Sequence, residues 1–95
     1  AIKPGTDIPL LQAMFNVLMW EEMLDVDYIE QHTSGFEKLL ERTRDMTPRK
    51  AADICGVSAA NIVQAAHWFG EGPSVSCWTM GLNQSTSGTD KNNAV

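Results

Sequence analysis

The sequence has few cysteines, few basic residues and no long hydrophobic run. Its two thiols, Cys55 and Cys77, form no C-x-x-C pair and no metal-ligand spacing. With no secretory signal in view, they favour a reduced, cytoplasmic setting. Seven Lys and Arg stand against 12 Asp and Glu, which argues against a nucleic-acid partner. The apolar stretches are too short for a membrane span, so no membrane partner is expected.

Motifs of the common catalytic sites are also missing. The chain contains no G-x-S-x-G, H-E-x-x-H, P-loop or G-x-G-x-x-G sequence. His32 and His67 lie far apart on separate predicted helices, so we expect surface or packing roles for both. Glu21 and Glu22 are consecutive, so on a helix their carboxylates point in different directions. The residues themselves therefore indicate no catalytic group and no metal ligand.

Helical patterning is abundant. Ninety-five residues, 43% hydrophobic and 20% charged, allow one small globular domain at most. Capping residues and apolar side chains at helical spacing predict about five helices. We expect these helices to begin at or near Thr6-Asp7, Asp25, Phe36, Thr47-Pro48 and Ser58.

One strand is expected after the helices. Residues 74–80 alternate Val75, Cys77 and Thr79 with polar or bulky neighbours, the pattern of a half-buried strand. A single strand needs neighbours for its backbone hydrogen bonds, and residues 1–3 could end another strand. The prediction is therefore a mostly α fragment of an α/β domain, with an incomplete parallel sheet.

A polar loop follows the predicted strand. Residues 81–88 have a glycine at each end and five uncharged polar residues between them. Such side chains both donate and accept hydrogen bonds, which suits a nucleotide cofactor. A plain solvent-exposed loop has the same composition, and on physical grounds alone it is favoured about two to one.

The tripeptide Gly-Thr-Asp occurs twice, at 5–7 and at 88–90, each time where a helix is expected to begin. Ordinary helix capping explains both copies. Anion binding at a helix N-terminus is the alternative. The carboxylate of Asp7 could also accept two hydrogen bonds from a guanine edge or a ribose.

Three segments resemble the molybdopterin oxidoreductase superfamily. Residues 2–8 (IKPGTDI) match its R/K-P-G-T-D segment, and residues 47–57 are similar to its T-P-x-x-A-A-x-I-x-G-V connector. Residues 78–86 (WTMGLNQST), followed by 88–93 (GTDKNN), resemble the catalytic subunit of assimilatory nitrate reductases. The similarity extends over essentially the whole chain, and its last segment is the most specific.

The resemblance implies a parent enzyme that carries molybdenum on two molybdopterin guanine dinucleotides, together with one [4Fe-4S] cluster. That enzyme would reduce nitrate to nitrite for nitrate assimilation, using a reduced electron donor. Gly5, Thr6 and Asp7 would bind a guanosine end of one cofactor, and Met80 and Gln84 would lie against the cofactor near the metal. Gly81 and Asn83 are weaker candidates from the same loop.

The chain also departs from the family pattern. The cluster-binding and molybdenum-binding cysteines of the family have no counterpart here, because Cys55 and Cys77 do not match them. Residues 1–95 are therefore expected to be one fragment of the dinucleotide-binding domain, inactive alone, with no bound cofactor. We expect it to self-associate through the apolar face of its first helix and through the strand edge.

Three alternatives remain. A periplasmic nitrate reductase, with the periplasmic location that this implies, and a formate dehydrogenase belong to the same superfamily. A freestanding helical interaction domain is an alternative of a different class.

Overall fold

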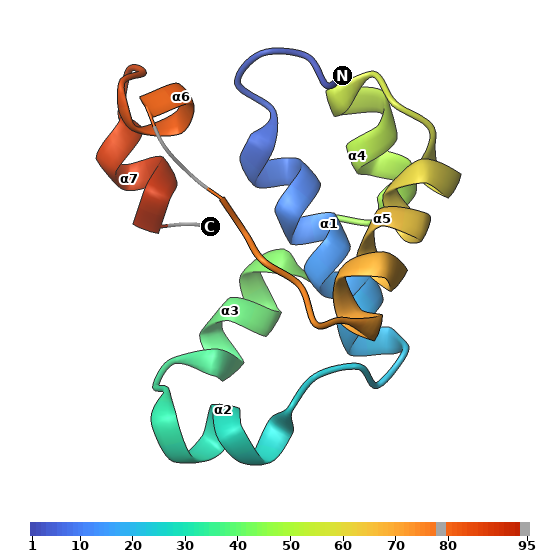
Figure 1. Ribbon diagram of the computed structural model, residues 1–95, viewed down its shortest axis with the longest axis vertical. Coiled ribbons are helices and arrows are strands. Elements are labelled where there is room, and N and C mark those ends of the chain that lie inside the picture. The colour runs from blue at the N-terminus through green and yellow to red at the C-terminus, as the bar shows by residue number, and fades with distance from the viewer. Residues whose placement is uncertain (78–79, 94–95) are drawn as a thin grey trace.

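The structure is a computed structural model that describes residues 1–77 and 80–93. Within these residues all regular structure is helical (Figure 1). The helices are α1 (Asp7–Trp20), α2 (Val26–His32), α3 (Phe36–Thr43), α4 (Pro48–Cys55), α5 (Ala59–Glu71), α6 (Met80–Asn83) and α7 (Gly88–Asn93). The first five are the helices predicted from the capping residues, and α7 begins where the second Gly-Thr-Asp predicts a helix start.

Local chemistry explains where these helices begin. The first amides of a helix lack partners in their own turn, and a side-chain oxygen just before the helix can accept from one of them. Three helices begin this way: Asp25 accepts from the amide of Tyr28 at 3.0 Å, Thr47 from Lys50 at 3.2 Å, and Ser58 from Asn61 at 3.2 Å.

The core lies where α1 packs against α4 and α5, which also pack against each other (Figure 1). Most of its side chains are small, so the helix backbones approach closely. The buried apolar residues are Ala13, Val17, Ala51, Cys55, Ile62 and Ala66. A glycine extends this close packing on α5, because a methyl group at Gly70 would lie 2.5 Å from a Leu18 methyl carbon and 2.8 Å from Cε of Met23.

A buried amide joins α1 to the end of α3. Asn16 is fully buried, and its Nδ2 donates to the carbonyl of Thr43 at 2.6 Å and to that of Met46 at 2.9 Å. Thr43 is the last residue of α3, where helical partners run out, and Met46 lies in the segment between α3 and α4. Asn16 therefore fixes α3 against α1 through polar contacts inside an otherwise apolar interface.

The predicted strand over residues 74–80 is wrong. Residues 73–77 have no regular structure, Met80 begins α6, and Trp78 and Thr79 lie outside the described residues. No strand occurs in the part of the chain that the structure describes, so the predicted parallel sheet is wrong as well. Alternating side chains favour a strand only when neighbouring strands accept its backbone hydrogen bonds. The amide of Lys3, in the segment expected to end another strand, donates to Cys55 at the end of α4 instead.

The last two helices stand apart from this core. Segment 73–77 runs from the end of α5 across α1, and α6 and α7 then pack mainly on each other, beside the first turn of α1 (Figure 1). Among the described residues, no helix has the length and hydrophobicity needed to cross a membrane.

Candidate functional site

A cavity of about 430 Å³ lies between the segment before α1 and the α6–α7 pair. One wall comes from the segment before α1, and the other from α6, the loop after it and α7. The lining residues are Ile2, Lys3, Pro4, Gly5, Asp7, Gly81, Leu82, Ser85 and Lys91. The cavity is thus built from the same two segments that the sequence marks as candidate binding regions.

The first wall is a tight turn over residues 3–6. Its closing bond runs from the amide of Thr6 to the carbonyl of Lys3 at 3.3 Å. Pro4 occupies the second position, where its ring fixes the backbone, and Gly5 occupies the third with φ +79°. A type II turn needs this left-handed conformation at its third position, and glycine adopts it without steric cost. The Pro-Gly pair therefore shapes the cavity wall.

Thr6 and Asp7 follow the turn and begin α1. The Thr6 hydroxyl donates to the Lys3 carbonyl at 2.7 Å and makes no capping bond to α1. It therefore stabilises the turn, and Thr6 does not line the cavity. Asp7 is half-buried and lines the cavity, and no described residue donates a hydrogen bond or forms an ion pair with its carboxylate. This carboxylate can accept hydrogen bonds from a ligand.

In the second wall, the ammonium group of a lysine is hydrogen-bonded to a serine hydroxyl. Lys91 Nζ donates to Ser85 Oγ at 3.1 Å, and Ser85 Oγ donates to the carbonyl of Leu82 at 2.8 Å. This chain of hydrogen bonds links α7 to the end of α6 and holds the ammonium group at the cavity.

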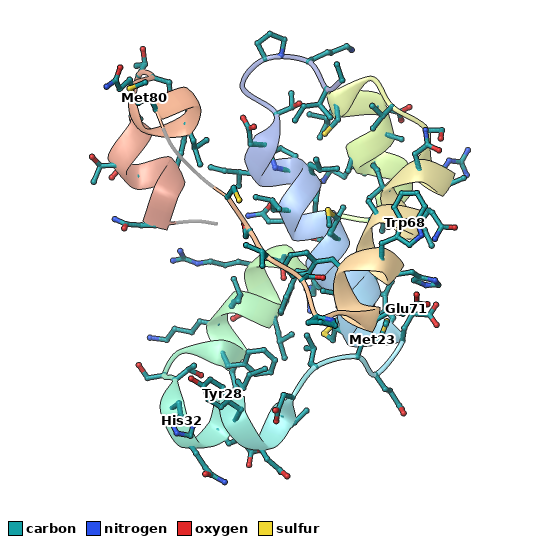
Figure 2. The ribbon with its side chains drawn as sticks, viewed as in Figure 1. Met23, Tyr28, His32, Trp68, Glu71 and Met80 are labelled. Carbon is teal, nitrogen blue, oxygen red and sulfur yellow. The ribbon has the colours of Figure 1, made fainter. Side chains whose placement is uncertain are left out.

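The other residues predicted on this side have different positions. Gly81 lines the cavity, whereas Met80 and Gln84 do not. Met80 is 65% exposed at the start of α6 (Figure 2), and Gln84 is exposed in the loop that follows. The side chain of Asn83 lies outside the described part of the chain. The prediction that Met80 and Gln84 contact a cofactor therefore depends on the family resemblance alone.

The end of α4 holds the first wall in place. The amide of Lys3 donates to the carbonyl of Cys55 at 2.9 Å, and the Cys55 thiol donates to the carbonyl of Thr6 at 3.4 Å. Cys55, which is fully buried, is therefore hydrogen-bonded to both ends of the 3–6 turn. The family resemblance marked residues 47–57 as a connector, but it gave no indication that Cys55 contacts the 3–6 turn.

The charges around the cavity suit an anion that also carries hydrogen-bond donors. Lys91 brings a positive charge and Asp7 a negative one, and Lys3, whose stem lies over Gly56 at the end of α4, is a second lysine among the lining residues. Phosphate oxygens accept from ammonium groups, whereas a ribose or a purine edge can donate to a carboxylate. Sequence reasoning missed both lysines, because single lysines are usually solvent-exposed. Their only signal was a position near a Gly-Thr-Asp tripeptide, two residues before the first for Lys3 and directly after the second for Lys91.

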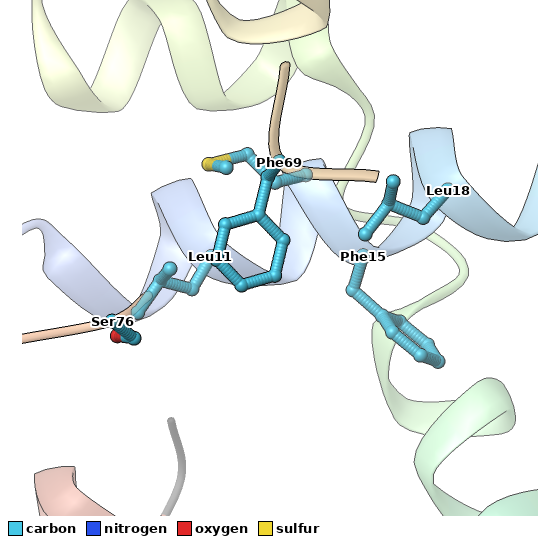
Figure 3. A pocket seen from close by; sticks show the side chains of 6 residues that line it. Leu11, Phe15, Leu18, Phe69 and Ser76 are labelled. Atoms are coloured by element: carbon cyan, nitrogen blue, oxygen red, sulfur yellow. The ribbon is translucent and has the colours of Figure 1, made fainter. Parts of the chain in front are cut away.

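Two other hollows fit this chemistry less well. A cavity of about 290 Å³ on α1 is lined by apolar side chains and Ser76, with Leu11, Phe15 and Phe69 around it (Figure 3). A hollow of about 620 Å³ lies against residues 29–38 at the α2–α3 junction. Neither contains a residue predicted to bind a ligand. Size alone therefore does not select the site.

Comparison with known proteins places this geometry in context. No family model matches the chain. It is 40% identical over 90 residues to an F420-dependent formate dehydrogenase subunit alpha of Methanocaldococcus jannaschii, covering 94% of the chain and 13% of that protein. It is 39% identical over 92 residues to a nitrate reductase of Synechocystis, covering 96% of the chain and 13% of that protein.

A solved structure agrees with these sequence relatives. Acetylene hydratase from Pelobacter acetylenicus superposes with a TM-score of 0.80 at 34% identity, over 86% of this chain and 11% of that chain. The chain therefore spans about an eighth of the length of the relatives that it matches.

Proposed function

Because this chain belongs to the molybdopterin oxidoreductases, we propose that it forms one wall of the cofactor site in the catalytic subunit of a nitrate reductase. The observation that carries this proposal is the cavity between the 3–6 turn and the α6–α7 pair. Its volume lies within the range of small-molecule sites. It accommodates one end of a dinucleotide and leaves the remainder to other parts of the protein.

The residues present fit the guanosine end of such a cofactor. Asp7 would accept hydrogen bonds from the base or ribose, and Lys3 and Lys91 would pair with phosphate oxygens. A side chain at Gly5 or Gly81 would meet no neighbouring atom within 4 Å, so both glycines border open space in which a ligand can approach the backbone. The bound group would supply two-electron oxygen-atom transfer, which converts nitrate to nitrite and water with two protons and an electron donor. This chain's residues would bind and orient it.

Surface exposure supports a place within a larger subunit. The chain exposes 6943 Å², whereas a monomeric protein of its mass exposes about 5,400 Å². Trp68 on α5 is 70% exposed (Figure 2), and Trp20 and Phe69 are each about half exposed. Several exposed large aromatic side chains are typical of surfaces that further protein covers. These observations favour the larger subunit over a freestanding interaction domain.

The choice of nitrate depends on residues 78–86, whose sequence resembles nitrate reductases. Formate oxidation is the second candidate, because the identity to the formate dehydrogenase relative is just as high. The whole polypeptide that contains this chain separates the two candidates. With reduced viologen dye, we expect nitrate to yield stoichiometric nitrite, whereas formate with oxidised dye yields no reduction. Activity with formate alone would establish the second candidate, and protein without molybdenum or pterin would overturn both.

The binding role of Asp7 has a direct test in the same polypeptide. Asp7→Asn removes a charged acceptor, and we expect about a tenfold or greater loss in affinity for guanosine monophosphate, measured by calorimetry on cofactor-free protein. Asp53→Asn is the matched control, because Asp53 is exposed on α4 and does not line the cavity. Equal affinity of wild type and Asp7→Asn would remove Asp7 from the site.

A further inference from the structure

A groove runs along the junction of α2 and α3. It consists of two hollows, of about 620 Å³ and about 300 Å³, which share Ile29 and residues 33–36 and are therefore continuous. The smaller hollow is also lined by Phe15 and Leu39. The ring of Phe36 meets the ring of Phe15 edge-on, with 6.2 Å between the ring centroids. The apolar floor of the groove is thus fixed to α1.

The helix on the other side of this groove buries none of its own side chains. α2 has no buried residue, and it lies at the edge of the molecule, away from the α1–α4–α5 core (Figure 1). Val26 is 50% exposed and Tyr28 is 58% exposed (Figure 2). A helix of seven residues depends on tertiary packing for its stability. A further element that covers the groove would supply packing that α2 lacks here.

The net negative charge of the chain gathers around the same groove. Residues 21–37 contain six acidic residues and no Lys or Arg, whereas the other 78 residues contain six acidic and seven basic residues. All six acidic residues are exposed, and two of them, Glu30 and Glu37, line the groove beside Lys38. Among the described residues, the only ion-pair contact to these carboxylates is that of His67 with Glu21, at 4.0 Å. The groove therefore combines an apolar floor with a rim that is mainly acidic.

This combination favours one kind of occupant. An amphipathic helix can lay its apolar face into such a groove, and Lys or Arg along its edges would meet the carboxylates of Glu30 and Glu37. A second copy of this chain is disfavoured, because it would bring carboxylates against carboxylates. Permanent contact with another part of the same polypeptide is disfavoured as well, since charged residues are depleted from the centres of such interfaces and burying a carboxylate is costly.

We propose that the α2–α3 groove is a docking site for a basic amphipathic helix of a separate protein. Apolar side chains of that helix contact Ile29, Phe36 and Leu39, and its cations face Glu30 and Glu37. The acidic residues around the groove also attract the partner from a distance, which speeds association at low salt. This inference goes beyond the proposed function and does not depend on it, because the groove and the nucleotide cavity share no lining residue.

Peptide binding to the whole polypeptide tests the proposal. The probe is a fluorescein-labelled synthetic helix with leucine at helical spacing on one face and lysine elsewhere, and binding is followed by fluorescence anisotropy. We expect saturable binding of one peptide per protein. A peptide with serine in place of leucine should bind about tenfold or more weakly, because it cannot fill the apolar floor. A peptide with glutamate in place of lysine should not bind.

Matched charge reversals separate the groove from the overall charge. Glu30→Lys combined with Glu37→Lys should weaken binding of the leucine–lysine peptide by about tenfold or more. Asp53→Lys combined with Glu71→Lys makes the same change of charge at exposed positions on α4 and α5 outside the groove, and it should change affinity less than about twofold. Leu39→Ala should weaken binding by about threefold, because it removes part of the floor.

Circular dichroism checks that the variants fold. If the reversal at the rim does not fold, Glu30→Gln combined with Glu37→Gln should still weaken binding by about threefold. Equal losses from the rim pair and the control pair would show attraction by net charge alone and would overturn the docking site. Absence of peptide binding to the wild type, or unchanged affinity in Leu39→Ala, would overturn it too. Each of these results leaves the nucleotide site as it stands.

Discussion

The α1–α4–α5 core and the α6–α7 pair hold their shapes in different ways. The core interlocks three helices through small buried residues, with alanines fully excluded from solvent. The α6–α7 pair consists of helices of four and six residues that pack mainly on each other, and most of its described residues are exposed. Helices this short depend on tertiary packing for their stability. The candidate site lies at the boundary, with one wall from each region.

This difference assigns different roles to the two walls. The 3–6 turn is bonded to α4 at both ends, so its backbone is fixed before a ligand arrives. The second wall depends on the Lys91–Ser85 and Ser85–Leu82 bonds, all of them among exposed or half-buried residues. Preorganised groups lower the entropy lost on binding. We therefore expect substitutions to be costly in the core and mild in the pair.

The largest expected effect is at Asn16, which connects the core to α3. Asn16→Asp replaces a donor to two carbonyls by a buried negative charge, and we expect a loss of about 4 kcal/mol in the free energy of unfolding. Urea unfolding followed by circular dichroism measures it. A loss under about 1 kcal/mol would show that Asn16 does not fix α3 against α1.

A paired truncation compares the two regions directly. Ile62 is 1% exposed in the core, and Ile62→Ala should cost about 3 kcal/mol through lost burial and a cavity. Leu82 is half-buried on α6, and Leu82→Ala should cost less than about 1 kcal/mol. The urea midpoints of the two variants provide the comparison, and equal losses would contradict the distinction between the regions.

A last comparison is between two helical glycines, one of which has the smallest expected effect. At Gly70 a new methyl group would press against Leu18 and Met23, so Gly70→Ala should cost about 1–2 kcal/mol despite its higher helix propensity. At Gly81 nothing lies within 4 Å, so Gly81→Ala should cause no loss of stability. Thermal melting of both variants measures these changes. Stabilisation by Gly70→Ala would show that α5 and α1 are less tightly packed than described.

Much of the fold was predictable because the signals are local. The caps at Asp25, Thr47 and Ser58 satisfy amides three residues away, so neighbouring residues suffice to place the helix starts. The strand prediction failed because alternation at 74–80 carries no information about a partner strand. The prediction for Thr6 was correct only in part. Its hydroxyl could accept from an amide of α1 as a helix cap or donate to a carbonyl of the preceding turn, and it donates to the carbonyl of Lys3.

The candidate site was predictable only in part. Gly5 and Asp7 line the cavity, as does Gly81, and each stands in a recognisable segment. The lysines were missed because their importance depends on two segments that meet in space, and no local rule brings residue 3 to residue 91.

The contact between the Cys55 thiol and the Thr6 carbonyl joins positions 49 residues apart. Closing so long a loop costs chain entropy before any contact is gained, so this bond forms late relative to the helices that it encloses. The 3–6 turn precedes α4 along the chain, yet its bonds to Cys55 require α4 to be docked on α1. We therefore expect any ligand that contacts this turn to bind after the core has folded.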